Sequence, residues 1–240
     1  MITVCLASYN GEKYIKEQID SILSQLERDD ELIISDDGSS DKTISIINSY
    51  KDNRILLLHN NKHGVNNNFE NAIRHAKGDY IFWSDQDDVW LPNKVQTCIE
   101  RLQTSDLVVH DCIVVDKNLK TIYPSYFKQF KSRPGYIKNI IKNSYIGACI
   151  AFRKEILSYI LPIPSKWPVY IDGWIASLVE MNGKINFCET TLILYRRHGN
   201  NTSPSAGKSN YSLFSKIYQR CGWLFFTLHR TIKLRLLNRC

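Results

Sequence analysis

Three carboxylates lie within four residues of this 240-residue chain, in the stretch SDQDDVW at positions 84–90. The residues before them, 79–83, form a β-branched and aromatic run that is typical of a buried strand. Carboxylates gathered at the end of a buried strand repel one another unless a cation offsets their charge. A divalent cation that also binds phosphate oxygens would do this, and a solvated acidic turn is the plain alternative.

The elements around this cluster alternate between strand and helix. Strands are expected at residues 2–8, 30–35, 55–59 and 79–84, and helices at 12–26, around 44–47, at 67–76 and at 93–102. This order, with strands apolar enough to be covered on both faces, predicts an α/β fold: a mostly parallel, Rossmann-like sheet flanked by helices. Ligands bind beyond the carboxyl ends of such strands, so the loops at 8–11, 36–41, 60–66 and 84–90 are expected to converge on one cleft.

The second half of the chain is less regular. Its expected strands are 107–115, 145–152, 184–188 and 192–195, and its expected helices are 153–161 and 172–181. Residues 117–133, 162–170 and 195–203 have loop character, and 205–209 have that of a linker.

Charge is distributed unevenly along the chain. The net charge is +7, but residues 1–189 carry all 24 acids and 22 of the 31 basic residues, which gives −2. The remaining nine basic residues follow Glu189 without any acid. A basic tail indicates an anionic partner. We do not expect nucleic acid, because the cleft is acidic and no nucleic-acid-binding fold is recognised.

The tail has a helical pattern. Its apolar residues recur at steps of three and four, at Phe214, Ile217, Cys221, Leu224, Phe225, Leu228 and Ile232. Lys216, Arg220, Arg230 and Lys233 fall on the other side. An amphipathic helix of this composition is typical of an anionic membrane surface, and a helix packed on the core is an equally open alternative.

The seven cysteines are scattered and form no Cys-x-x-Cys pair, which favours buried free thiols in a reducing compartment. No window reaches the roughly 20 apolar residues of a membrane-spanning helix. The first residues lack the basic and apolar regions of a signal peptide. We therefore expect the chain in the cytoplasm or on the cytoplasmic face of the membrane.

Six stretches, taken in order, resemble the family 2 inverting glycosyltransferases with the GT-A fold, especially their bacterial rhamnosyltransferase-like branch. They are VCLASYNGE (4–12), SDDGSSDKT (35–43), GDYI (78–81), SDQDDVW (84–90), DGW (172–174) and YRRHGN (195–200). The resemblance implies a GT-A domain over residues 1–205, and it leaves residues 206–240 as a separate amphipathic helical tail.

For the nucleotide, the resemblance implies that Ala7, Ser8, Tyr9 and Asn10 wrap the nucleoside. Asp36 or Asp37 would accept the N3–H of uracil or thymine. A carboxylate at that place rejects bases that lack the donor, because its buried charge would stay unpaired. The alternative is a plain helix N-cap.

For the metal, the resemblance implies that Asp87 binds Mg²⁺ or Mn²⁺ and that Asp85 binds the ribose or a metal-bound water. Asp88 has no assigned ligand role, and a cap of the next helix is its plain interpretation. Trp90 is expected to wall the sugar pocket, or else to lie in the core. The cation would neutralise charge on the leaving nucleoside diphosphate.

The catalytic base implied by the resemblance is Asp172, and Trp174 beside it is expected in the donor and acceptor pocket. Many relatives carry His or Glu before this Asp, whereas Ile171 stands here. A pure N-cap is the alternative for Asp172.

A basic loop over the pyrophosphate is the implied role of Arg196 and Arg197, which could make bidentate phosphate contacts. His198 is expected to add a metal ligand. Asn68 is expected to reach the sugar or merely to start a helix.

The expected function is therefore metal-dependent, inverting transfer of rhamnose or a hexose from a dTDP- or UDP-sugar to a saccharide acceptor. The acceptor would be polyprenyl-linked, as in bacterial surface polysaccharide assembly. A sugar-nucleotide-forming nucleotidyltransferase is the alternative, but the loop after the first strand has no basic residue before Lys13 to hold a triphosphate. A non-catalytic sugar-nucleotide-binding subunit is the third possibility.

Overall fold

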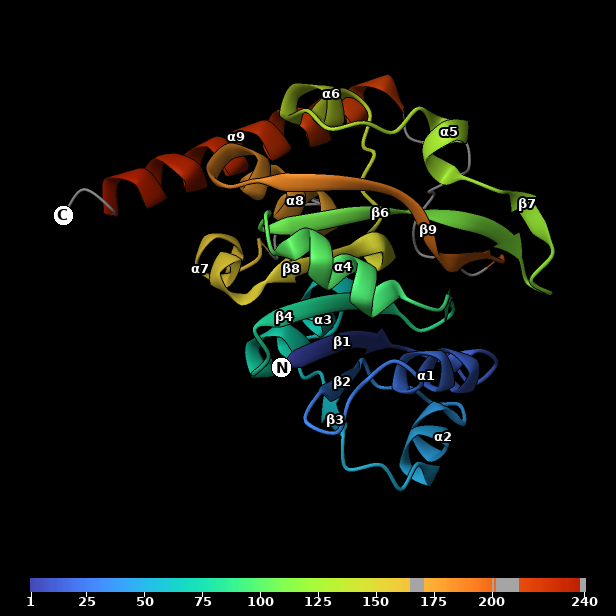
Figure 1. The fold of residues 1–240 in the computed structure, drawn as a ribbon. Coiled ribbons are helices and arrows are strands. Elements are labelled where there is room, and N and C mark those ends of the chain that lie inside the picture. Colours follow the sequence, from blue (N-terminus) through green and yellow to red (C-terminus); the bar gives the residue numbers. More distant parts are fainter. Residues whose placement is uncertain (165–170, 200, 202–211, 238–240) are drawn as a thin grey trace.

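A computed structural model of the chain describes residues 1–164, 171–199, 201 and 212–237 (Figure 1). In this part of the chain, nine strands form one sheet. The strands are β1 (Ile2–Ser8), β2 (Glu31–Asp36), β3 (Ile55–His59), β4 (Tyr80–Asp85), β5 (Val89–Trp90), β6 (Leu107–Asp116), β7 (Thr121–Tyr123), β8 (Ile150–Arg153) and β9 (Ile185–Arg197). Their order is β3-β2-β1-β4-β8-β6-β9-β5, with β7 paired to β6.

The two ends of the sheet differ in strand direction. Strands β3, β2, β1 and β4 are parallel, with Cys5 of β1 between Ile33 of β2 and Trp83 of β4. Strand β8 is antiparallel to both β4 and β6, and β9 runs parallel to β6. The predicted α/β sheet is confirmed, with its parallel ladder concentrated in the first four strands.

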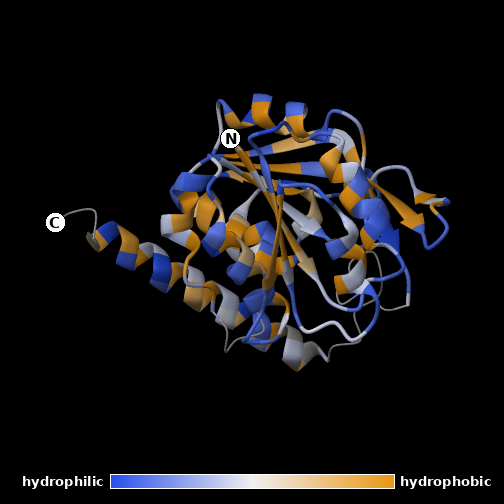
Figure 2. Cartoon of the chain, turned by 90° about the horizontal axis from the view of Figure 1, so that it is seen from below, coloured by the Kyte–Doolittle hydropathy of each residue, from blue (hydrophilic) through white to orange (hydrophobic). Residues whose placement is uncertain are grey.

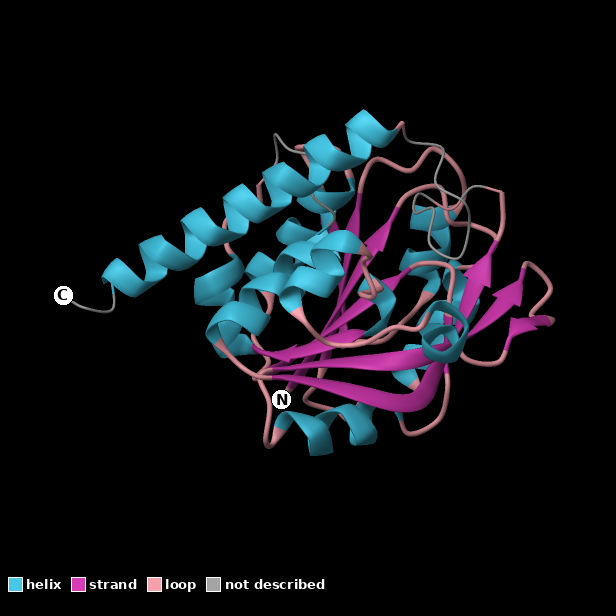
Figure 3. Cartoon of the chain, turned by 90° about the horizontal axis from the view of Figure 1, so that it is seen from above, coloured by secondary structure: helices cyan, strands magenta, loops and turns pink. Residues whose placement is uncertain are grey.

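Helices cover the sheet and its edges. They are α1 (Ile15–Leu23), α2 (Thr43–Ser49), α3 (Val65–His75), α4 (Lys94–Leu102), α5 (Tyr126–Phe130), α6 (Tyr136–Ile141), α7 (Leu157–Ile160), α8 (Ile171–Asn182) and α9 (Leu213–Leu237), with 3₁₀ turns η1 (Gly147–Cys149) and η2 (Lys154–Ile156). Helix α3 packs on β1 and β2, and α4 packs on β6 and β9. Helix α9 runs along one side of the molecule, and its C-terminal end extends beyond the rest (Figures 1 and 3).

The core forms where the apolar faces meet. Ile15, Ile19 and Ile22 of α1 are fully buried, as are Leu6 of β1 and Ile33 of β2. Figure 2 shows the hydrophobic strands inside and the hydrophilic loops around them. Apolar burial of this kind stabilises the sheet and fixes the loops at its carboxyl edge. Cys5, Cys98, Cys112, Cys149 and Cys188 are buried free thiols, as predicted, whereas Cys221 is exposed.

Three local predictions in the second half need correction. The two strands expected at 184–188 and 192–195 are one strand, β9, whose pairing with β6 shifts register so that His110 faces Cys188 and Asp111 faces Thr191. The residues skipped by this shift, 189 and 190, are exposed, which explains the polar break in the pattern. The expected loop at 117–133 contains β7 and α5, and the expected strand at 145–152 starts only at Ile150, after η1.

Some predictions stay untested. The linker at 205–209 and part of the loop at 162–170 lie outside the described residues. The division into domains 1–205 and 206–240 therefore remains a prediction. Among the described helices, none is both long enough and apolar enough to cross a membrane.

Candidate active site

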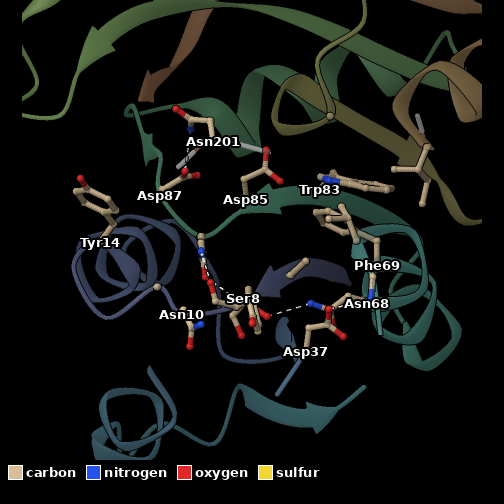
Figure 4. Close-up of a pocket in the computed structure, with 18 of the residues that line it drawn as sticks. Ser8, Asn10, Tyr14, Asp37, Asn68, Phe69, Trp83, Asp85, Asp87 and Asn201 are labelled. Atoms are coloured by element: carbon tan, nitrogen blue, oxygen red, sulfur yellow. Dashed lines mark hydrogen bonds between the residues drawn. The ribbon is translucent and has the colours of Figure 1, made fainter. Parts of the chain in front are cut away.

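A cavity of about 1190 Å³ opens at the carboxyl ends of β1, β2 and β4. Its wall comes from the loops after β1, β2, β3 and β4, as the sequence predicted, and also from η1, the first turn of α8 and the end of β9 (Figure 4). One residue of the tail, Gln219 of α9, also lines it. The cavity therefore joins both halves of the chain.

The loop after β1 lines the cavity with the four residues predicted to wrap a nucleoside: Ala7, Ser8, Tyr9 and Asn10. Gln86, the residue between the two aspartates, accepts a hydrogen bond from the Tyr9 N–H (2.8 Å) and donates one to the Tyr9 carbonyl (2.9 Å). This pair of bonds ties the β1 loop to the β4 loop. No role was predicted for Gln86, because nothing in its residue type indicates a bridge between two loops.

The two neighbouring aspartates after β2 have different surroundings. Asp36 is buried and accepts four hydrogen bonds: from the hydroxyls of Ser8 (2.8 Å) and Ser39 (2.6 Å), and from the N–H groups of Gly38 (3.0 Å) and Ser39 (2.8 Å). It does not line the cavity. Its side chain shapes the loop, so the expectation that Asp36 meets the base is corrected.

Asp37 does line the cavity. It accepts hydrogen bonds from the Asn60 side-chain amide (2.7 Å) and the Gly64 N–H (2.8 Å), and its carboxylate lies 3.4 Å from the His63 ring. These partners hold it at the end of the cavity beside Ser8 (Figure 4). Of the two aspartates, Asp37 is therefore the one that a ligand in the cavity could contact.

The other end of the cavity holds the predicted metal ligands. Asp85 and Asp87 both line it, and Nε2 of His198 lies 2.7 Å from Oδ2 of Asp87. The Asn201 amide donates to the same oxygen (3.1 Å), and the Tyr14 ring stacks on His198 with 5.0 Å between centroids. Asp87 and His198, which are 111 residues apart and were both predicted as metal ligands, therefore lie side by side. Asn201 and Tyr14 were not predicted.

These residues fit a divalent cation that takes further ligands from a substrate. Burial, followed by the charges of Asp87 and Asp172, raises the pKa of Asp85 to about 7. A cation would relieve this crowding of carboxyl groups. In the described part of the chain, no three His, Cys, Asp or Glu side chains gather closely enough to hold a metal by themselves. Phosphate oxygens would have to complete the ligand set, which is common for Mg²⁺.

Asp88 and Trp90 lie behind this end of the cavity. Asp88 is buried, with Oδ1 accepting from the Arg196 N–H (2.9 Å) and Oδ2 unpartnered among the described residues. It does not cap α4, whose N-cap is Asn93. Trp90 packs in the core against Phe82 and under the ammonium of the buried Lys94, at 4.1 Å, so it does not wall the sugar pocket.

The two arginines depart from the prediction that they cover a pyrophosphate. The Arg196 guanidinium is buried, pairs with Glu17, and donates to the carbonyl oxygens of Asp87 (2.7 Å) and Lys117 (3.1 Å). It braces the loop from behind and does not line the cavity. Arg197 lies against the Tyr195 ring at 5.9 Å, also outside the lining. Of this loop's predicted residues, His198 reaches the cavity.

Asp172, the predicted base, lines the cavity from the first turn of α8. Burial raises its pKa to about 6, and the N–H groups of Gly173 and Gly147 partly offset that rise. The Gly173 N–H donates to Asp172 Oδ1 at 2.7 Å. Asp172 thus accepts a hydrogen bond at the start of α8 and also lines the cavity. Trp174 instead points into the core, where its indole N–H donates to the Ile160 carbonyl (2.9 Å).

An aromatic wall and a buried amide complete the cavity. Trp83 and Phe69 both line it, with ring centroids 3.8 Å apart. Asn68 is buried, donates to the Ser8 carbonyl (3.1 Å) and leaves Oδ1 without a partner among the described residues. The predicted place of Asn68 beside the ligand fits this orphaned acceptor. The sequence did not indicate Trp83 and Phe69, because apolar residues in a strand and a helix look like ordinary core.

Comparison with known proteins agrees with this geometry. The family model "Glycosyl transferase family 2" matches residues 3–161. An uncharacterized glycosyltransferase of Nostoc is 31% identical over 219 residues, which cover 87% of this chain and 68% of that protein.

Two other relatives have more specific names. The Escherichia coli UDP-Glc:alpha-D-GlcNAc-diphosphoundecaprenol beta-1,3-glucosyltransferase WfaP is 37% identical over 43% of this chain. The Shigella flexneri dTDP-rhamnosyl transferase RfbG is 34% identical over 50% of it. The matches span 42% and 43% of those two proteins, less than half of their length.

Solved structures support the fold. Staphylococcus aureus TarS 1-349 in complex with UDP-GlcNAc superposes with a TM-score of 0.71 at 17% identity, over 95% of this chain and 69% of that one. The mannosyltransferase PcManGT of Pyrobaculum calidifontis, in complex with GDP-Man and Mn²⁺, gives 0.59 at 19% identity, over 97% and 64%. At these identities the likeness concerns the fold alone.

Proposed function

The chain belongs to glycosyl transferase family 2, and we propose that it is an inverting, metal-dependent enzyme that moves rhamnose or a hexose from a dTDP- or UDP-sugar to a saccharide acceptor. The acceptor is carried on a polyprenyl diphosphate, in the assembly of bacterial surface polysaccharide. One observation carries the proposal: a single cavity holds Asp37 at one end and, at the other, Asp172 close enough to Asp85 to raise its pKa. Asp87 and His198 lie beside them.

Asp37 selects the nucleotide in this proposal. Its carboxylate accepts the N3–H of uracil or thymine, while Asn60 and Gly64 hold it in place. A base without that donor leaves the half-buried Asp37 carboxylate one hydrogen bond short, which discriminates against such a base. Ser8, Tyr9 and Asn10 line the same end of the cavity and surround the nucleoside. Asp36 holds Ser8, Gln86 holds Tyr9, and Ser39 holds Asn10.

Asp87 and His198 would hold Mg²⁺ or Mn²⁺, with Asp85 nearby for the ribose or a metal-bound water. When bound, the cation neutralises the charge that develops on the diphosphate. Arg196 keeps the Asp87 backbone in place through its carbonyl. The Asn201 amide donates to Asp87, and the Tyr14 ring stacks on His198.

Asp172 acts as the general base. As an ionised carboxylate it takes the proton of the acceptor hydroxyl, whose oxygen forms the new bond to the anomeric carbon. The bond from that carbon to the diphosphate oxygen breaks on the opposite face, and the electron pair leaves with the nucleoside diphosphate. One displacement inverts the configuration. A pKa of about 6 leaves most of the Asp172 carboxylate ionised at neutral pH.

The proposal is tested by release of nucleoside diphosphate from dTDP-rhamnose, UDP-glucose and UDP-galactose in the presence of a lipid-linked saccharide acceptor and Mn²⁺. The wild type should turn over at least one donor, and Asp172→Asn should not. Asp29→Asn is the matched control, because Asp29 is an exposed carboxylate that does not line the cavity. Equal turnover of all three proteins would refute the base assignment.

A further inference from the structure

Helix α9 has a packed face. The Trp223 indole N–H donates to the Ser177 hydroxyl of α8 (3.0 Å), and Thr227 shares a hydrogen bond with the Tyr136 hydroxyl of α6 (2.6 Å). Arg230 donates to the Tyr159 carbonyl (2.9 Å). These contacts hold α9 on α6, α7 and α8, so it is part of the folded body.

The opposite face of α9 is exposed and apolar. Phe214 is 79% exposed, Phe225 63% and Ile232 58%. They belong to a stripe that repeats at steps of four and three residues, which keeps all its members on one side of a helix. The stripe consists of Phe214, Tyr218, Cys221, Phe225, Leu228, Ile232 and Leu236. A continuous exposed apolar surface of this length indicates an interaction site.

Basic side chains accompany the stripe. Lys233 and Arg235 are exposed, Arg220 is half-buried, and no acid occurs anywhere in α9. The neighbouring helix α6 adds exposed Ile137 and Ile141, each beside an exposed lysine. The surface therefore combines apolar and aromatic side chains with positive charge. That combination fits the interface of an anionic bilayer, where apolar groups enter between headgroups and cations meet lipid phosphates.

A second copy of the chain fits this surface less well. Two α9 helices packed on their stripes would bring together two sets of lysine and arginine with no acid to pair with them. Helices that associate through such stripes normally place opposite charges along the flanks. Charge complementarity thus favours a lipid surface.

Helix α9 also touches the cavity. Gln219 lines it, and the Trp223 ring packs against Gly173, the residue that follows Asp172. The helix with the exposed stripe is therefore the one that supports the proposed base. The stripe and the wall of the cavity lie on the same rigid element.

We propose that α9, together with α6, docks on an anionic membrane and holds the Asp172 end of the cavity at the bilayer surface. A saccharide carried on a membrane lipid then reaches the cavity without leaving the membrane. The membrane docking is inferred from the exposed surface of α9 and α6 alone. Its role in bringing a lipid-linked saccharide to the cavity rests on the proposed glycosyl transfer.

The test is sedimentation of the full chain with vesicles of equal parts phosphatidylglycerol and phosphatidylcholine. The wild type should bind, less tightly at high salt and to phosphatidylcholine alone. The double variant Phe225→Glu/Ile232→Glu should bind at least tenfold more weakly. Ile122→Glu on β7, 45% exposed and far from α9 in sequence, is the matched control and should bind like the wild type.

Fold is checked by circular dichroism. If the double variant unfolds, Lys138→Gln/Lys233→Gln changes two exposed lysines only and should still reduce binding severalfold. Absence of wild-type binding, or equal loss in the Ile122→Glu control, would overturn the proposal. So would a wild-type dimer, measured by light scattering, that dissociates in the stripe variant. Vesicle binding needs no donor, so binding without turnover would refute the proposed function and leave the docking intact.

Discussion

The two ends of the cavity are built on different principles. At the end proposed to bind the nucleoside, Asp36 accepts four hydrogen bonds and Asp37 two, so the protein itself supplies partners for both carboxylates. At the end proposed to be catalytic, burial raises the pKa of both Asp85 and Asp172, and Asp88 keeps an unpartnered oxygen among the described residues. At the first end, the hydrogen-bond partners of the carboxylates come from the protein. At the second end the protein offsets the carboxylate charge only in part, and a cation would offset more of it.

The largest expected effect is at Asp172. Replacing it with Asn keeps the shape and removes the base, so turnover should fall about 10³-fold, within the usual range for general-base catalysis. Donor binding at the other end should be unchanged. The measurement is nucleoside diphosphate release alongside donor titration by fluorescence. A loss smaller than tenfold would mean that the catalytic end does not depend on this carboxylate.

The next effect concerns Asp87, which faces His198 and Asn201. Asp87→Ala should lower turnover about 10²-fold and raise the Mn²⁺ concentration for half-maximal rate at least tenfold, as loss of a metal ligand or its partner does. Turnover is measured across a Mn²⁺ titration. Asp41→Ala also removes a cavity-lining carboxylate, but one near the nucleoside end, and should leave the Mn²⁺ midpoint in place.

The pH dependence follows from the raised pKa of Asp172. The base must be ionised, so kcat/KM should be level above pH 7 and fall about tenfold per pH unit below about 6. The sign follows from the chemistry: protonation at low pH removes the base. Rates are measured between pH 5 and 8 at saturating Mn²⁺. A profile that rises toward pH 5 would contradict the assignment.

The smallest effects separate the neighbouring aspartates. Asp36→Ala strips the partner from two hydroxyls and two N–H groups, and should lower the free energy of unfolding by about 2 kcal/mol. Asp37→Ala should destabilise less and raise the donor KM more, with reduced preference for uracil and thymine nucleotides. Urea unfolding and donor kinetics are compared for the pair. Identical behaviour of both variants would remove the distinction between scaffold and site.

The sequence predicted that the loops after β1, β2 and β4 meet in one cavity, because these loops follow the parallel strands directly. It left Asp36 and Asp37 undecided, since adjacent residues on a loop differ in direction only through bonds to distant partners such as Ser8 and Asn60. It misplaced Arg196 for the same reason. In the sequence, an arginine whose partner Glu17 lies 179 residues away cannot be distinguished from a surface arginine.

The aromatic wall of the cavity could not be predicted from the sequence, for a different physical reason. Burial by the core and burial by a ligand favour the same side chains, so Trp83 and Phe69 carried no local signal. The tail was predicted as an amphipathic helix with two open roles. In the structure the helix has one packed face, where Trp223 contacts α8, and one exposed face, where Phe225 lies.

Gly173 has a practical consequence. A Cβ at this position would lie 2.5 Å from ring carbons of Trp223, so no side chain fits unless the indole moves. Gly173 and Trp223 thus pack as a complementary pair between α8 and α9. A chimera that exchanges the second half of the chain with that of a relative must exchange α8 and α9 together. A chimera that keeps one helix and replaces the other would have either a steric clash or a cavity at this contact.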